Sequence, residues 1–362
     1  MACGLNVFSI ITLIVANLSP LAGGAPQVPC YFIFGDSLAD DGNNNPLLSL
    51  AKVNFPPYGI DFPDGPTGRF TNGRTTVDII AELLGFTDRI LPFVNATGTN
   101  ILRGVNYASG GGGIRDETGT NVGGRFSMNG QLANHQVTLS RIATLRRSTV
   151  DEAKEYVGKC IYSVGIGSND YINNYLIPQI YPTSTLFTPD QYAAALITQY
   201  EQQLRTLYTA GARKVALFDV GPIGCTPAEI ATFGTNGSAC VDFINAYVTL
   251  FNTRLKTLVD QLNCDLTDGK FIYINTTHIN SGDPSAAGIT ILNAPCCSVS
   301  ATTGLCIPNS IPCTNRSIYA FWDAFHPTEI VSQLVAPRAY SAATPMDTYP
   351  IDIRCLAQLQ LY

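Results

Sequence analysis

Two kinds of apolar pattern alternate along the chain. Short and nearly unbroken apolar runs predict buried strands, and they lie at 30–35, 101–107, 160–166, 214–220 and 270–274. Longer stretches whose apolar residues recur every three or four positions predict amphipathic helices, and they lie at 75–84, 188–211 and 241–262. Alternating strands and helices predict an α/β fold, with a parallel sheet covered by helices on both faces.

Three long segments interrupt this alternation. Residues 40–72, 221–239 and 280–316 are rich in Gly, Pro and Asn, and we expect them to form long loops. None of them has the composition of a linker between domains, and no internal repeat is present. The sequence therefore predicts one decorated domain over residues 26–362.

The charge balance excludes some classes of protein. Charged residues make up 13% of the chain and the formal net charge is −6, whereas about 25% is usual in a soluble domain. Nucleic-acid binding needs clustered Lys and Arg, so we expect no nucleic-acid partner. The apolar content is 46%, enough to exclude a disordered chain.

Residues 1–25 have the layout of a secretory signal peptide. They contain no charged side chain, and a short apolar run at 7–15 precedes small residues that end in Gly24 and Ala25. A membrane anchor is the alternative, but the run is shorter than the roughly 20 residues that a spanning helix needs. We therefore predict cleavage near Gly24 or Ala25, no stable membrane anchor, and a secreted, extracellular protein.

The cysteines agree with an oxidising compartment. The chain has 11, and cleavage of the signal peptide would remove Cys3 and leave an even number, which we predict to be fully disulfide-bonded. The sequence does not determine the pairing, although Cys225 and Cys240 flank a stretch that a bridge could close. There is no Cys-x-x-Cys pair and there are only three histidines, so we expect no metal and no cofactor. In the mature part of the chain, four Asn-x-Ser/Thr sequons, each a glycosylation candidate, lie at Asn95, Asn236, Asn275 and Asn315.

The candidate chemistry lies where the predicted strands end. In a parallel α/β sheet, ligands bind at the carboxyl ends of the strands, and the first strand ends in Gly35-Asp36-Ser37. A serine on a sharp turn after a strand is a candidate nucleophile, although this is not the Gly-x-Ser-x-Gly elbow of other hydrolases. The alternative is that Ser37 or Asp36 only caps a following helix.

A nucleophilic serine needs a base, and histidine is the usual one. His326 follows Asp323 by three residues, whereas His135 and His278 have no carboxylate nearby in the sequence. We interpret Asp323 and His326 as the acid and base of a triad. The alternative is a purely structural Asp–His pair.

Two further segments offer donors to a developing oxyanion. The run 110–113 consists of four glycines with unhindered backbone N–H groups, and Asn169 follows the strand predicted at 160–166. A phosphate cradle is the alternative for the glycines, but neither the Gly-x-Gly-x-x-Gly spacing nor a following Gly-Lys-Ser/Thr is present.

Together these segments resemble the plant-type GDSL esterase/lipases of the SGNH hydrolase superfamily. The resemblance rests on several blocks in the right order over residues 31–329. They are Phe34-Gly-Asp-Ser-Leu-Ala-Asp-Asp-Gly-Asn-Asn-Asn, Pro57-Tyr-Gly, Gly68-Arg-Phe-Thr-Asn-Gly-Arg, Asn106-Tyr-Ala-Ser-Gly-Gly-Gly-Gly-Ile, Gly167-Ser-Asn-Asp-Tyr, Gly221-Pro-Ile-Gly-Cys-Thr-Pro, Cys296-Cys, and Phe321-Trp-Asp-Ala-Phe-His-Pro-Thr-Glu.

The resemblance implies a three-layer αβα, flavodoxin-like fold with a five-stranded parallel sheet. It assigns the nucleophile to Ser37, the acid and base to Asp323 and His326, and the oxyanion hole to the Ser37 N–H, Gly111 and Asn169. Within the glycine run, Gly110 and Gly112 stay as alternatives to Gly111. The implied activity is hydrolysis of lipid or other acyl esters through an acyl-enzyme.

We interpret several other residues in these blocks as structural. Asp36, Asp40 and residues 43–45 are expected to hold the turn that presents Ser37. Arg69 and Arg74 are expected to make structural ion pairs, and Trp322 and Phe325 to pack the catalytic loop or line the cleft. None of these residues belongs to the predicted catalytic set.

Two other functions are compatible with the same residues. An acyltransferase would use the same triad with an alcohol in place of water, and a non-catalytic lipid- or carbohydrate-binding protein would use the cleft alone. The expected partner is a small-molecule or polymer-borne ester, in the cell wall or apoplast if the source is a plant. The sequence predicts neither the acyl nor the alcohol specificity, nor the oligomeric state.

Overall fold

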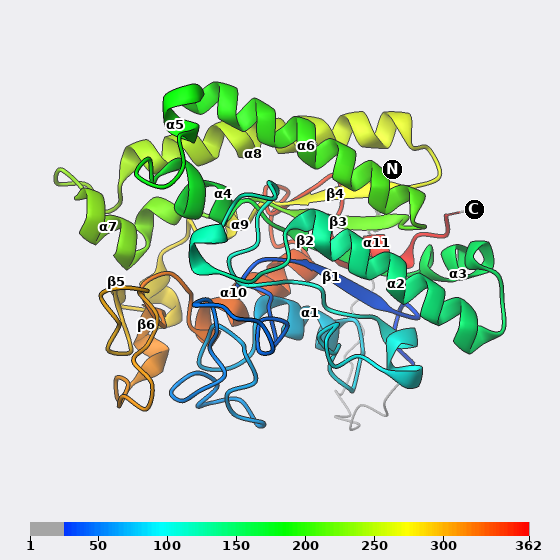
Figure 1. The fold of residues 1–362 in the computed structure, drawn as a ribbon, viewed down its shortest axis with the longest axis horizontal. Helices are drawn as coiled ribbons and strands as arrows, with labels where there is room; N and C mark the ends of the chain where they lie inside the picture. The colour runs from blue at the N-terminus through cyan, green and yellow to red at the C-terminus, as the bar shows by residue number, and fades with distance from the viewer. Residues whose placement is uncertain (1–24, 362) are drawn as a thin grey trace, which may run out of the picture.

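A single mixed sheet forms the centre of the molecule (Figure 1). The computed structural model describes residues 25–361; the predicted signal peptide, apart from Ala25, lies outside them. The sheet has the order β1-β2-β3-β4-β7, in which β1 to β4 are parallel and β7 is antiparallel to β4. Its strands are β1 (Tyr31–Gly35), β2 (Ile161–Gly165), β3 (Lys214–Phe218), β4 (Lys270–Ile274) and β7 (Thr348–Tyr349).

Helices cover both faces of the sheet. The longer ones are α1 (Thr76–Leu83), α2 (Met128–Arg146), α3 (Val150–Val157), α6 (Pro189–Thr209), α8 (Asp242–Asp265) and α10 (Glu329–Tyr340). The shorter ones are α4 (Ser168–Asp170), α5 (Thr183–Leu186), α7 (Pro227–Phe233), α9 (Thr276–Ile279) and α11 (Ile353–Gln358), with a π-helical turn at Tyr171–Tyr175. A small second sheet pairs β5 (Ile291–Pro295) with β6 (Tyr319–Phe321).

Alternate residues of the strands form two separate cores. Phe32 and Phe34 point into one core, with α2, α3, α6 and α8, while Tyr31 and Ile33 point into the other, with α1, α10 and α11. Because side chains alternate across a strand, a strand with helices on both sides is apolar throughout, as the sequence indicated. The predicted three-layer α/β architecture is therefore confirmed.

The sheet departs from the prediction at its two edges. The fifth hydrogen-bonded strand, β7, is antiparallel rather than parallel. The strand predicted at 101–107 begins as a short 3₁₀ helix over Gly98–Arg103, and only the following residues extend beside β1. They bind it through the Ile33 N–H to Val105 O (3.1 Å) and the Tyr107 N–H to Ile33 O (2.7 Å). This parallel pairing brings the glycine run beside the end of β1.

The helix predicted at 188–211 forms as α6. Thr188 is its N-cap, Pro189 lies in its first turn, and the side chains of Thr188 and Gln191 complete the capping box. The helices predicted at 75–84 and 241–262 form as α1 and α8. Among residues 25–361, no helix combines the length and the apolar character needed to cross a bilayer.

Candidate active site

Ser37, Asp323 and His326 lie in one hydrogen-bonded chain. Ser37 follows β1, and its Oγ is 2.8 Å from His326 Nε2. His326 Nδ1 is 2.8 Å from Asp323 Oδ2 and 2.9 Å from Oδ1. With Nδ1 donating to the carboxylate, Nε2 is left as the acceptor for the serine proton. The structure thus joins residues that are 289 positions apart in the sequence.

The three residues of this hydrogen-bonded chain are buried to different extents. Asp323 is fully buried and His326 is 7% exposed, whereas Ser37 is only half-buried. The ring of Phe70 packs on the imidazole with 4.8 Å between ring centroids. The carboxylate is therefore shielded from water, while the serine is partly exposed to solvent.

Backbone hydrogen bonds distinguish between the glycines of the predicted oxyanion hole. The Gly110 N–H donates to Asp40 Oδ2 (2.9 Å) and the Gly112 N–H donates to Ser109 O (2.9 Å). Among the described residues, the N–H groups of Ser37 and Gly111 have no such acceptor. Gly111 has φ +79°, and a Cβ there would lie 2.8 Å from Val122 Cγ2, so this position favours glycine.

Asn169 uses one of its two side-chain N–H groups in a hydrogen bond within the protein. It lies in α4, directly after β2, and its Nδ2 donates to Gly112 O (3.0 Å) while its Oδ1 accepts from Asn173 Nδ2 (2.7 Å). A side-chain amide has two N–H groups, so one remains for a ligand. The amide oxygen is held by Asn173, which fixes the orientation of the group.

The polar residues around Ser37 make structural contacts, in line with the interpretation of the sequence. Asp40 Oδ1 accepts from the N–H groups of Gly42 and Asn43 (both 2.8 Å). Asn43 Nδ2 in turn donates to Asn106 O (2.9 Å) and Ala108 O (2.8 Å). This network ties the turn after β1 to the strand-like segment that carries the glycines.

Asp36 lies beneath the same turn. Burial raises the pKa of Asp36 to about 6, although the Leu38 N–H and the nearby His326 favour its charged form. Its Oδ1 accepts from the Leu38 N–H (3.0 Å). The side chain holds the backbone around Ser37 rather than the serine hydroxyl.

The two arginines in the matched blocks also have protein partners. Arg69 is 3% exposed and binds Asp78 through Nε and Nη2 (2.8 and 2.7 Å). Arg74 pairs with Glu329 (2.6 Å) and with Glu82 (2.8 Å), which joins the starts of α1 and α10.

Two side chains that hold the site were not among the predicted site residues. Gln131 of α2 is fully buried and bonds the backbone of Gly35. Tyr58, which belongs to the Pro-Tyr-Gly block, donates to Asp323 Oδ2 (2.6 Å). Neither contact follows from spacing, because the partners are 96 and 265 residues apart.

Eight cysteines form four disulfides. The pairs are Cys30–Cys160, Cys225–Cys240, Cys296–Cys313 and Cys297–Cys306, so the bridge between Cys225 and Cys240 forms as the sequence allowed. The prediction that all cysteines of the mature chain are paired is wrong for Cys264, an exposed free thiol near the end of α8. Its position on the solvent side of the helix explains why it has no cysteine partner.

The four sequons differ in exposure. Asn95, Asn236 and Asn315 are exposed, whereas Asn275 is half-buried. Asn275 caps α9 by accepting from the His278 N–H (3.0 Å), and its Nδ2 donates to Met346 O (3.1 Å).

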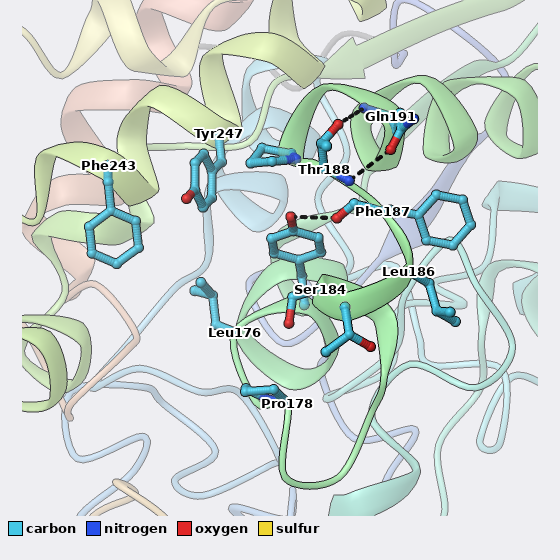
Figure 2. A pocket seen from close by; sticks show the side chains of 12 residues that line it. Leu176, Pro178, Ser184, Leu186, Phe187, Thr188, Gln191, Phe243 and Tyr247 are labelled. Carbon is cyan, nitrogen blue, oxygen red and sulfur yellow. Dashed lines mark hydrogen bonds between the residues drawn. The ribbon is translucent and has the colours of Figure 1, made fainter.

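A separate groove of about 560 Å³ lies between the segment after α4 and the start of α8 (Figure 2). Leu176, Phe187, Phe243 and Tyr247 contribute to its walls. The Tyr175 hydroxyl, which donates to Phe187 O (2.9 Å), braces one side. No member of the triad or of the predicted oxyanion hole lines this groove, so we do not count it as part of the candidate active site.

The chain is similar over most of its length to proteins of one family. Residues 31–338 match the model of the GDSL-like Lipase/Acylhydrolase family. GDSL esterase/lipase At1g29670 of Arabidopsis thaliana is 51% identical over 338 residues, covering 92% of this chain and 92% of that protein. GDSL esterase/lipase At5g45670 of Arabidopsis thaliana is 48% identical over 360 residues, covering 98% and 99%.

The chain therefore belongs to the GDSL-like lipase/acylhydrolase family. It is a hydrolase of ester bonds, as the sequence predicted. A crystal structure of phospholipase A1 from Streptomyces albidoflavus NA297 aligns with 86% of this chain and 97% of that chain, at 14% identity and a TM-score of 0.35. That likeness is too weak to bear on fold or substrate.

Proposed function

We propose that the protein is a secreted carboxylic-ester hydrolase that works through an acyl-enzyme on Ser37. The observation that carries the proposal is the continuous chain of hydrogen bonds from Asp323 through His326 to Ser37 Oγ. A serine hydroxyl is a weak nucleophile until a neighbouring base removes its proton, and this geometry supplies that base.

In the first step, Ser37 Oγ attacks the ester carbonyl carbon while His326 Nε2 takes the hydroxyl proton. The negative charge that develops on the carbonyl oxygen is met by the N–H groups of Ser37 and Gly111 and by the Asn169 amide. His326 then donates its proton to the leaving alcohol, and the acyl group remains on Ser37. Asp323 orients the imidazole and stabilises its cation.

In the second step, water attacks the acyl-enzyme. His326 takes a proton from the water, the oxyanion forms again at the same donors, and the proton returns to Ser37 as the free acid leaves. An alcohol in place of water would give transesterification with the same groups. The two outcomes differ in product, so a candidate alcohol is supplied and new ester is measured against free acid.

The nucleophile is tested with an organophosphate probe. The wild-type protein is expected to take up one covalent label, and Ser37→Ala to take up none while unfolding at the same temperature. Labelling that persists at another serine in Ser37→Ala overturns the assignment. A non-catalytic binding protein would leave both variants unlabelled.

Secretion is proposed from the signal-like residues 1–25, with the four disulfides as support. N-terminal sequencing of protein collected outside the cell is expected to begin within a few residues of Pro26. A chain that begins at Met1 would contradict the proposal. The substrate class is proposed to be lipid or other acyl esters, and a hydrolysis screen over acyl lengths, acetylated glycans and phenolic esters tests it.

A further inference from the structure

A loop closed by two disulfides surrounds the Asp323 end of the triad. We call residues 296–313 the disulfide loop, because Cys296–Cys313 and Cys297–Cys306 both lie within it. Its residues form a third small core that includes Tyr58, Phe70 and Trp322. In Figure 1 this region lies beside β5 and β6, at the left of the view.

The disulfide loop holds the backbone on both sides of Asp323. Before Asp323, the Cys297 N–H donates to Trp322 O (3.1 Å). After it, the Ala324 N–H donates to Gly304 O (3.0 Å). Gly304 has φ +68°, and a Cβ at this position would lie 2.5 Å from the Phe325 ring, so the loop approaches the catalytic segment as closely as the backbone allows.

Tyr58 connects the same loop to the carboxylate itself. Its hydroxyl accepts from the Cys306 N–H (3.0 Å) and donates to Asp323 Oδ2 (2.6 Å). Asp323 Oδ1 is already held by the N–H groups of Phe325 (2.9 Å) and His326 (2.8 Å). Tyr58 therefore fixes Oδ2, the oxygen 2.8 Å from His326 Nδ1.

The Tyr58 side chain is itself held in place. It is 1% exposed, and its ring packs edge-on against Phe55 and Trp322, with 5.6 and 6.5 Å between ring centroids. Burial and the nearby charge of Asp323 raise the pKa of Tyr58 well above its ordinary value. The hydroxyl thus stays protonated, and it remains a donor wherever Asp323 is charged.

We propose that Tyr58 is a positioning residue for the triad, through which the disulfide loop fixes the orientation of the Asp323 carboxylate. The proposal rests on the proposed function, because it matters only if Asp323 orients a catalytic His326. One consequence is that turnover depends on the Cys297–Cys306 bridge, which holds the Cys306 N–H against the Tyr58 hydroxyl. A purely structural Tyr58 would affect folding but not the chemical step.

The first test compares Tyr58→Phe with a matched tyrosine. Tyr31 is fully buried, and its hydroxyl is hydrogen-bonded to Ser163 Oγ (2.7 Å). Neither of these two residues belongs to the triad. Tyr58→Phe loses two buried hydrogen bonds and Tyr31→Phe loses one, so both are expected to lower the melting temperature, Tyr58→Phe by the larger amount. Only Tyr58→Phe is expected to lower kcat, by roughly tenfold to a hundredfold, the range that misplacement of a catalytic group produces. Its KM is expected to stay near the wild-type value, because Tyr58 does not contact the serine.

The second test is a double-mutant cycle with the bridge. Cys297→Ser with Cys306→Ser is expected to lower kcat in the wild-type background and to lower it by a smaller factor in the Tyr58→Phe background, because the two changes act through one contact. Gly304→Ala offers a second disturbance of the loop that keeps both disulfides, should the cysteine variant not fold.

A wild-type kcat in Tyr58→Phe, or fully additive effects in the cycle, overturns the proposal. Its failure is distinguishable from failure of the proposed function. In the first case Ser37 still takes up the organophosphate label and only the Tyr58 effect is missing, whereas in the second Ser37→Ala retains labelling or activity.

Discussion

The side chain of Gln131 makes two hydrogen bonds to the backbone of Gly35. The Gly35 N–H donates to Gln131 Oε1 (2.9 Å), and Gln131 Nε2 donates to Gly35 O (2.7 Å). Gly35 ends β1, two residues before Ser37. Gly35 O also accepts from the Ser109 N–H (3.1 Å), so the main contribution of the α2 amide is an acceptor for the Gly35 N–H.

Gln131→Leu is expected to lower both stability and turnover. Leucine fills a similar volume but leaves the Gly35 N–H buried without its side-chain acceptor, a loss of about 1–3 kcal/mol in the free energy of unfolding. Because Gly35 leads into the turn that carries Ser37, kcat is expected to fall as well. Urea unfolding and steady-state kinetics measure the two effects.

Gln136→Leu on the same helix is the control for Gln131→Leu. Gln136 is exposed, so its replacement is expected to leave the free energy of unfolding and kcat close to wild type. Equal free energies of unfolding for the Gln131 and Gln136 variants would show that the two hydrogen bonds to Gly35 contribute nothing.

Asn169→Ala is expected to lower kcat by roughly a hundredfold to a thousandfold, the effect of removing one oxyanion donor. The side chain is 6% exposed and its second N–H is the one available to the substrate oxygen, so the loss is expected in the chemical step. Asn173→Ala is the companion variant, because Asn173 holds the amide oxygen of Asn169 (2.7 Å), while its own Oδ1 accepts from Asn121 Nδ2 (3.3 Å). It is expected to show a smaller loss, and an Asn169→Ala enzyme as active as wild type would exclude the oxyanion role.

The local sequence was sufficient to predict those helices and strands whose apolar residues follow a regular pattern. The four parallel strands were predictable because helices on both faces require strands that are apolar throughout. The helix α2 was not predicted, because buried positions on it are polar, among them Gln131, His135 and Thr138. These polar side chains form hydrogen bonds with other parts of the fold. Because they occupy buried positions, apolar residues do not recur every three or four positions along α2, which is the pattern that predicts a helix.

The candidate catalytic residues could be proposed from the sequence, whereas the residues that contact and support them could not. Asp323 and His326 are three residues apart, and the blocks around them match a family pattern. Tyr58 and Gln131 act on the site through contacts that the tertiary fold creates, and the antiparallel β7 likewise depends on where the chain returns after α10. Spacing along the chain carries no information about such pairs.

Cys264 is expected to react with a thiol reagent in the folded protein. It is exposed in the last turns of α8, whereas the bonded cysteines have no thiol to offer. A maleimide applied without denaturant is expected to modify Cys264, as peptide mapping shows directly. Cys264→Ser is expected to lose that label and keep wild-type activity, because α8 leads into the start of β4, at the edge of the sheet opposite the strand end that precedes Ser37. Absence of the label in native wild-type protein would show that Cys264 is bonded in solution.

Glu229→Gln is expected to stabilise the protein at neutral and alkaline pH. Glu229 lies in the first turn of α7 and is 5% exposed, and burial raises its pKa from 4.5 to about 7. A carboxyl group with a raised pKa in the folded state favours folding below pH 4.5, and that contribution is lost as the pH rises through 7. The gap between 4.5 and about 7 corresponds to roughly 3 kcal/mol in the free energy of unfolding.

Glutamine keeps the shape of Glu229 without the charge. The free energy of unfolding of Glu229→Gln minus that of wild type is therefore expected to rise between pH 4.5 and 7 and to stay constant at higher pH. Urea unfolding at a series of pH values measures this difference. Glu155→Gln serves as the control, because Glu155 is exposed on α3 and its charge lies in water in both the folded and unfolded states. A difference for Glu229→Gln that is the same at every pH would mean that the buried carboxyl does not titrate in this range, and the raised pKa would then be wrong.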